Sequence, residues 1–161
     1  MAQPVPEPAE VVKELRSKVL ALSPSDLGIA PTTQHPRVWG VLMEMGLPEG
    51  LATLVALGDG TVSLYLGHGG SAIGGGAHAH VRQTAESMLT LAEQHLDQLA
   101  PAHAYPLPEV GRVKFYVLTF SGTLAADADE DDVGERKHTL SPLFYAGQDV
   151  ITESRQVSEQ K

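Results

Sequence analysis

The residues best suited to chemistry in this sequence gather in one glycine-rich stretch beside histidines. The segment from Gly67 to Gly76 follows an apolar run and precedes a helical pattern, and two further histidines come directly after it. Free backbone amides at a helix N-terminus favour bound anions. The sequence therefore predicts a candidate anion or phosphate site whose contacts would be Gly69, Gly70, Ser71, Gly74, Gly75, Gly76, His68, His78 and His80.

A purely structural interpretation of the same glycines stays open beside that hypothesis. No Gly-Lys-Ser/Thr sequence follows the segment, so the phosphate loop of nucleotide-binding enzymes is absent, and the spacing does not fit a dinucleotide-binding turn. Glycine also lets a chain turn tightly and lie close to a sheet without any ligand.

Metal binding is a second kind of chemistry to consider for the histidines and the acids. Imidazole is a common metal ligand, but His78 and His80 are two residues apart, no His-Glu-x-x-His motif is present and the chain has no cysteine. The aspartates in the run from 127 to 132 begin with the spacing of a calcium-binding loop, yet Asp132 stands where glycine is needed and His138 where glutamate is needed. We therefore expect no metal site and no cofactor, and interpret the acidic run as a solvated hairpin loop.

The sequence holds no complete catalytic motif, and its aromatic residues suggest contact rather than catalysis. There is no Gly-x-Ser-x-Gly turn and no cysteine nucleophile. Trp39, Phe144 and Tyr145 are the candidate anchors of a protein interface, because aromatic side chains are enriched there. The alternative is that they fill the core.

The elements that must position these residues begin with a hairpin and a helix. Two apolar runs, 51–57 and 61–66, are joined by Gly58-Asp59-Gly60, which predicts a tight β-hairpin. From Val81 to Leu99 apolar residues recur three and four apart, which predicts one long central helix packed on a sheet.

The remaining elements complete a single domain. The pattern predicts helices over about 9–22 and 142–157, strands over 37–46 and 112–121, continuation of the latter to Leu124, and a weaker strand over 136–140. We expect an α+β fold of two layers, a mainly antiparallel sheet of four to five strands with the central helix and the N- and C-terminal helices packed on it. Residues 9–157 would form the domain, with flexible segments at 1–8 and 158–161.

Charge and hydropathy exclude several classes of partner. The net charge of −9 opposes non-specific binding to nucleic acid or to an anionic membrane surface. No apolar run approaches the roughly 20 residues that span a bilayer, and the first residues carry prolines and acids where a signal peptide needs basic and then apolar residues. We expect a cytoplasmic protein.

The predicted order of helix, three strands, helix, one or two strands and helix resembles the profilin, longin and roadblock group of small α/β modules. The resemblance implies a dimerising or scaffolding platform, although three strands precede the central helix where roadblock domains have two. The leading hypothesis is a non-catalytic interaction or scaffold module, homodimeric through a sheet edge or the C-terminal helix. The alternative is a small-ligand protein or enzyme that uses the Gly67–Gly76 loop.

Overall fold

One antiparallel sheet of seven strands organises the chain. The computed structural model describes residues 3–69, 71–73 and 78–159, and the strands lie in the order β4-β3-β2-β1-β6-β7-β5. Their bounds are β1 (Val38–Leu47), β2 (Gly50–Leu57), β3 (Val62–Leu66), β4 (Ser71–Ile73), β5 (Ala100–Pro101), β6 (Arg112–Thr119) and β7 (Gly122–Asp129). The predicted hairpin is confirmed as β2 and β3, which pair from Ala52 opposite Leu66 to Ala56 opposite Val62.

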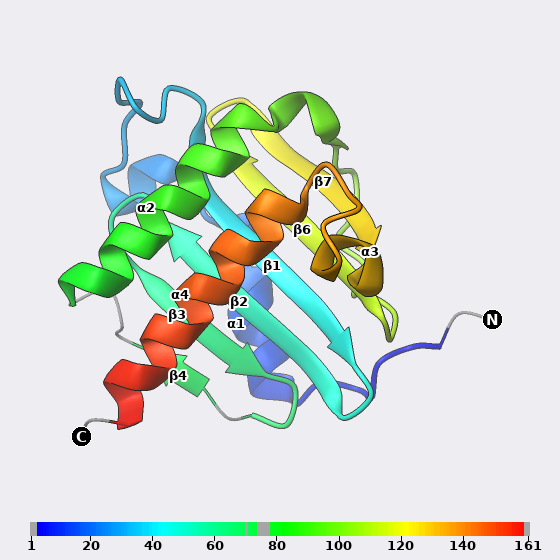
Figure 1. Cartoon of the computed structure of the whole chain (residues 1–161). Coiled ribbons are helices and arrows are strands. Elements are labelled where there is room, and N and C mark those ends of the chain that lie inside the picture. The colour runs from blue at the N-terminus through cyan, green and yellow to red at the C-terminus, as the bar shows by residue number, and fades with distance from the viewer. Residues whose placement is uncertain (1–2, 70, 74–77, 160–161) are drawn as a thin grey trace.

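Helices cover both faces of this sheet, so the fold has three layers and the expected two-layer arrangement is wrong. The helix α1 (Glu10–Ala21) lies on one face, and α2 (Ala79–Gln94) and α4 (Ser141–Glu159) lie side by side across the other (Figure 1). The short helix α3 (Glu130–Gly134) follows β7, and two 3-10 turns, η1 (Pro24–Leu27) and η3 (Leu96–Gln98), complete the helical elements of the described part of the chain.

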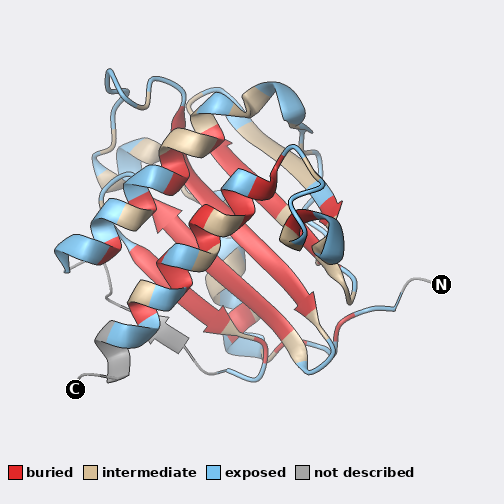
Figure 2. Cartoon of the chain, viewed as in Figure 1, coloured by how far each residue is buried: buried red, intermediate tan, exposed pale blue. Residues whose placement is uncertain are grey.

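The central strand explains why both faces are covered. In β1, Val41 and Met43 pack into the layer of α2 and α4, whereas Leu42 packs into the layer of α1. Because successive side chains point to opposite faces of a strand, an apolar strand needs cover on both sides. The burial of the central strands is visible in Figure 2.

A glycine within α4 brings that helix close to the sheet. A Cβ atom at Gly147 would lie 2.6 Å from the sulfur of Met43 and 3.1 Å from the terminal methyl group of Met88 in α2. Glycine disfavours a helix, but at this position it allows α4 to pack closely against β1 and α2.

Several predicted boundaries are corrected by the structure. The central helix ends at Gln94 rather than Leu99, because His95 leaves helical geometry and its ring contacts the Leu91 carbonyl at 2.7 Å. The chain then continues as η3, and α4, with 19 residues, is longer than α2, with 16.

The region after β6 differs most from the prediction. The strand does not continue to Leu124 but turns back, with Gly122 at a positive φ of 136°, and β7 pairs along β6. The acidic run is not a loop: Asp127 and Asp129 belong to β7 and the following acids to α3. Residues 136–140, all within the described part of the chain, form no strand. Together with β4 and β5, β7 raises the sheet from the expected four or five strands to seven.

The segment before α1 lies along the molecule where it is described. Pro4 forms a bridge with Glu109, the N–H of Val110 donates to the Gln3 carbonyl at 2.8 Å, and Val5 is buried. The predicted flexibility of 1–8 and 158–161 stays a prediction. Within the described residues, no helix is both long enough and apolar enough to cross a bilayer.

Candidate interaction surface

The predicted anion site is divided by a short strand. Gly67 follows β3 in a buried position, where a Cβ would lie 2.9 Å from the backbone nitrogen of Leu51, and Gly69 adopts a positive φ of 106°. Ser71 then begins β4, opposite Tyr65. Gly67 and Gly69 thus serve a close approach and a turn, while Gly70, Gly74, Gly75 and Gly76 lie outside the described residues.

The three histidines of the prediction are all exposed. His78 is the N-cap residue of α2 but its side chain makes no capping hydrogen bond, His80 lies in the first turn, and His68 lies beyond β3. No group of three or more potential metal ligands comes together in the described part of the chain. Among the residues that the structure describes, these histidines therefore do not assemble a ligand set.

The three predicted aromatic anchors differ in accessibility. Trp39 is 3% exposed and donates its indole N–H to the carbonyl of Thr119 at 3.1 Å, and Phe144 is 7% exposed. Tyr145 is half-buried: its hydroxyl donates to the Gly134 carbonyl and the guanidinium of Arg136 lies 4.1 Å from its ring centroid. Their role at an interface stays a prediction, and among the three only Tyr145 offers partly open surface.

A buried charged cluster lies under α1, and sequence reasoning missed it. Glu44 in β1 has no exposed surface, and Arg16 of α1 reaches it with two hydrogen bonds, from Nε to Oε2 and from Nη2 to Oε1, each 2.8 Å long. The hydroxyl of Thr53 in β2 donates to Oε2 at 2.7 Å. The available signal was a single acid inside an otherwise apolar strand, which requires a cationic partner when it is buried.

The segment between β5 and β6 closes this cluster from outside. Arg16 also donates to the carbonyl of Tyr105 at 2.8 Å, and the hydroxyl of Tyr116 donates to the carbonyl of Pro106 at 2.6 Å. Burial, with the nearby Glu44 carboxylate, raises the pKa of Tyr116 to about 12, so this phenol stays neutral at physiological pH. The cluster is closed and satisfied, which suits a fastening for α1 better than a site of chemistry.

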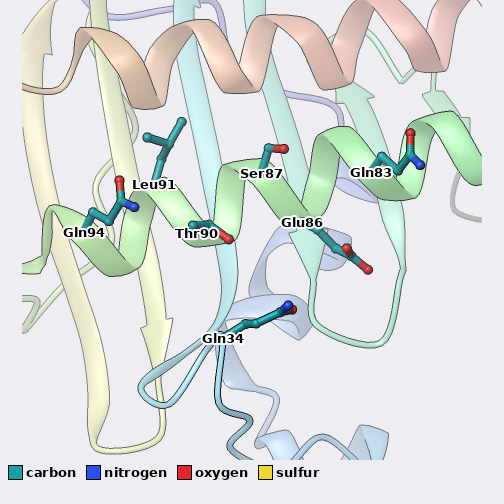
Figure 3. A pocket seen from close by; sticks show the side chains of 7 residues that line it. All are labelled: Gln34, Gln83, Glu86, Ser87, Thr90, Leu91 and Gln94. Carbon is teal, nitrogen blue, oxygen red and sulfur yellow. The ribbon is translucent and has the colours of Figure 1, made fainter.

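A shallow hollow lies on the outer face of α2. Gln83, Glu86, Ser87, Thr90, Leu91 and Gln94 line a shallow hollow of about 600 Å³ with Gln34 at its border. Figure 3 shows Ser87 and Leu91 pointing toward α4 and Glu86 pointing toward the side of Gln34. We call this surface the α2 face.

A second hollow continues the α2 face toward α4. It is lined by Gln83, Thr84, Ser87 and Leu91 of α2 and by Pro142, Tyr145, Ala146 and Asp149 of α4. Among all residues lining the two hollows, only Glu86 and Asp149 carry charge. The α2 face is thus mainly uncharged but rich in amides and hydroxyls, which both donate and accept hydrogen bonds.

Searches for related proteins add nothing to this geometry. Comparisons of the chain with models of protein families, with curated proteins and with solved structures gave no match. The resemblance to the profilin, longin and roadblock group stays an expectation drawn from element order.

Proposed function

We propose that this protein is a non-catalytic interaction module that works as a homodimer through the α2 face. The observation that supports the proposal is that this face, in a strongly acidic chain, consists mainly of uncharged hydrogen-bonding side chains, with Glu86 and Asp149 as its charged members. Two copies with a net charge of −9 each repel one another, so they meet most easily where the surface carries little charge.

The chemistry of the α2 face also favours a copy of the same chain as partner. A two-fold interface brings one surface patch against itself, so its groups must be complementary to themselves. Side-chain amides such as those of Gln83 and Gln94 carry both donors and acceptors, and they satisfy this condition. Carboxylates or guanidinium groups alone do not.

This proposal revises the position of the contact within the leading hypothesis, which assigned it to a sheet edge or to the C-terminal helix. The α4 residues Tyr145 and Asp149 border the second hollow, so the C-terminal helix contributes a rim to the proposed interface. The centre of the proposed contact is on α2.

The experiment is light scattering on the full chain across a dilution series, with native mass spectrometry in parallel. We expect a dimer at high concentration that dissociates on dilution. Ser87→Arg should give a monomer, because two like charges brought together in a contact cost several kcal/mol. The matched control is Thr152→Arg, at an exposed position of α4 that lines neither hollow, which should dimerise like the original chain.

Two results would overturn the proposal. The first is a wild-type chain that stays monomeric at the highest concentration reached. The second is a Ser87→Arg chain with an unchanged far-ultraviolet circular dichroism spectrum and an unchanged dimer.

The alternative proposal is anion binding at the start of α2, and one observation favours it. The first turn of α2 contains no acidic residue, and the side chain of its N-cap residue, His78, makes no capping hydrogen bond. The first backbone amides of α2 therefore have neither an acidic side chain of the first turn nor the N-cap side chain to accept from them. Titration with inorganic phosphate, followed by heteronuclear NMR, tests it. Shifts confined to the first turn and weakened in His78→Ala would support the alternative, and unchanged spectra would reject it.

A further inference from the structure

A separate cleft lies at the end of the sheet where β1 begins and β6 turns into β7. Its volume is about 480 Å³, and Arg37, Leu96 and Ser121 are among the residues that line it. Sites for small molecules commonly have volumes of roughly 300–1,000 Å³. None of its lining residues lines either hollow of the α2 face. We call it the Arg37 cleft, and what it binds is a question independent of the homodimer.

One wall of the Arg37 cleft is apolar. Leu124 of β7 pairs with Pro101 of β5 and with Val117 of β6, and Val117 packs into the layer of α2 and α4. Because cross-strand partners project from the same face of a sheet, Leu124 and Pro101 lie on that face as well. Leu96, in the 3-10 turn after α2, packs against the same layer. The lining residues Leu96, Pro101 and Leu124 are half-buried or exposed, so they leave apolar surface open to a ligand.

Arg37 supplies the charged group of the cleft, and Glu93 of α2 holds it in place. Oε1 of Glu93 accepts hydrogen bonds of 2.9 Å from the backbone N–H groups of Arg37 and Val38, and Oε2 accepts one of 2.8 Å from Nε of Arg37. Nη2 contacts the Glu93 carbonyl at 3.5 Å, and Nη1 makes no hydrogen bond to the residues that the structure describes. The guanidinium is thus fixed along one edge and keeps donors for a ligand at the other, which lowers the entropy lost on binding.

The turn between β6 and β7 adds a hydroxyl group to the cleft. The N–H of Phe120 donates to the Arg37 carbonyl at 3.0 Å, so this turn runs directly past the arginine. Ser121 is exposed, and its Oγ lies 3.4 Å from Oγ1 of Thr119, which is long for a hydrogen bond between hydroxyls. The Thr119 hydroxyl itself donates to the Gly122 carbonyl. The Ser121 hydroxyl can therefore turn to a ligand at little cost.

We propose that the Arg37 cleft binds a small organic acid with one carboxylate and an apolar body. The guanidinium of Arg37 and the hydroxyl of Ser121 donate to the carboxylate, and the body covers the apolar wall. Arg37 is the only charged residue among the described residues that line the cleft. An amine would therefore find no free carboxylate there, and a ligand with two negative charges would find only one cation.

The experiment is a titration of the isotope-labelled full chain with phenylpropionate at constant pH, followed by heteronuclear NMR. We expect the shifts to concentrate at the backbone amides of Ser121, Gly122 and Ala102, which line the cleft. Acetate has the charge without the apolar body and should bind at least about tenfold more weakly. Phenylpropylamine has the body with the opposite charge and should leave these amides unshifted.

Variants of the chain test the two polar contacts. Arg37→Gln should weaken phenylpropionate binding at least about tenfold. The matched control is Arg112→Gln, because Arg112 also donates from Nε to an acid, Asp127, at 3.1 Å but does not line the cleft; its affinity should be unchanged. Arg37→Gln also breaks the contact with Glu93. Ser121→Glu, at an exposed position of the turn, leaves that contact intact and adds a repelling carboxylate, so it should cause a similar loss.

The outcomes decide the proposal without reference to the dimer. Shifts at the cleft amides, weaker binding of acetate, no effect of the amine, and losses in Arg37→Gln and Ser121→Glu but not in Arg112→Gln support it. It is overturned by the absence of shifts in the cleft, by equal binding of acetate or of the amine, or by undiminished affinity in either cleft variant. If Arg37→Gln does not fold, Ser121→Glu decides alone. A monomeric wild-type chain would overturn the homodimer and leave this inference standing.

Discussion

Replacing Arg16 by methionine should destabilise the fold by about 3–5 kcal/mol, although the residue lies on a peripheral helix. The substitution keeps most of the aliphatic stem and removes the guanidinium. Glu44, which has no exposed surface, then keeps the Thr53 hydroxyl as a hydrogen-bond donor but loses its cationic partner.

The size of this loss of stability follows from the hydration that the buried carboxylate gives up. A carboxylate taken out of water loses several kcal/mol of hydration, and two charge-assisted hydrogen bonds of 2.8 Å now offset that loss. Removing one partner leaves the penalty without its compensation. Thr53→Val removes only one hydrogen bond to the charged group and should cost less, about 1.5–3 kcal/mol.

The double variant Arg16→Met with Glu44→Met provides the decisive comparison. It removes both charges and keeps apolar volume, so it should recover much of the stability lost in Arg16→Met. The free energies of unfolding of the double variant and of Arg16→Met and Glu44→Met alone together measure the coupling between the two residues. The single tryptophan, Trp39, is 3% exposed in the same layer, so its fluorescence reports urea unfolding beside far-ultraviolet circular dichroism.

Urea rather than guanidinium is the denaturant of choice, because a salt would screen the pair under test. A loss below about 1 kcal/mol in Arg16→Met, the range of exposed ion pairs, would refute the reasoning. So would simple additivity of the two single losses in the double variant.

Three further predictions concern the rest of the scaffold. In Gly46→Ala the new Cβ would overlap the carbonyl oxygen of Glu109, a backbone atom that cannot rotate away. The substitution should lower the thermal midpoint of unfolding by an amount equivalent to about 3 kcal/mol. An unchanged midpoint would contradict this. Burial and neighbouring carboxylates raise the pKa of Glu130, so its negative charge opposes folding above that pKa. Glu130→Gln should therefore stabilise the chain at neutral pH, and this gain in stability should vanish in acid. Urea unfolding at both pH values measures the gain. Burial opposes ionisation of Glu93, but hydrogen bonds from two backbone N–H groups and from Arg37 outweigh burial and lower the pKa of this carboxyl group. The ionised Glu93 therefore stabilises the fold above pH 4.5, and this stabilisation is lost as the pH falls below 4.5. If Glu93→Gln and the wild type were equally sensitive to acid in urea unfolding, the assignment would be refuted.

Periodicity predicted the elements that are long and apolar on a regular pattern. The strand over 37–46, the hairpin that follows and the start of the central helix all depend on local spacing, and the structure places them within a few residues. The end of α2 was harder to predict, because Leu96 and Leu99 continue the apolar spacing beyond the helix. Leu96 lies in the 3-10 turn and Leu99 follows it, and both still pack against the core.

The missed features depend on contacts between distant parts of the chain. β5 has two residues and exists because it pairs with Leu124 and Ala125 of β7, and no sequence pattern records such a pairing. The partner of Glu44 is 28 residues away on a helix whose face was not known to lie over β1. The α2 face likewise depends on the neighbouring placement of α4, so its shape was not available from the polar residues of α2 alone.

The short edge strand β5 has a consequence for aggregation. It ends in Pro101, which has no N–H to offer, and beyond its two paired residues the edge of β7 leads to Asp127 and Asp129. Proline and charge at a sheet edge both hinder the addition of a strand from another molecule. This edge therefore resists growth into a continuous intermolecular sheet, and crowding of the chain should yield discrete assemblies here rather than fibrils.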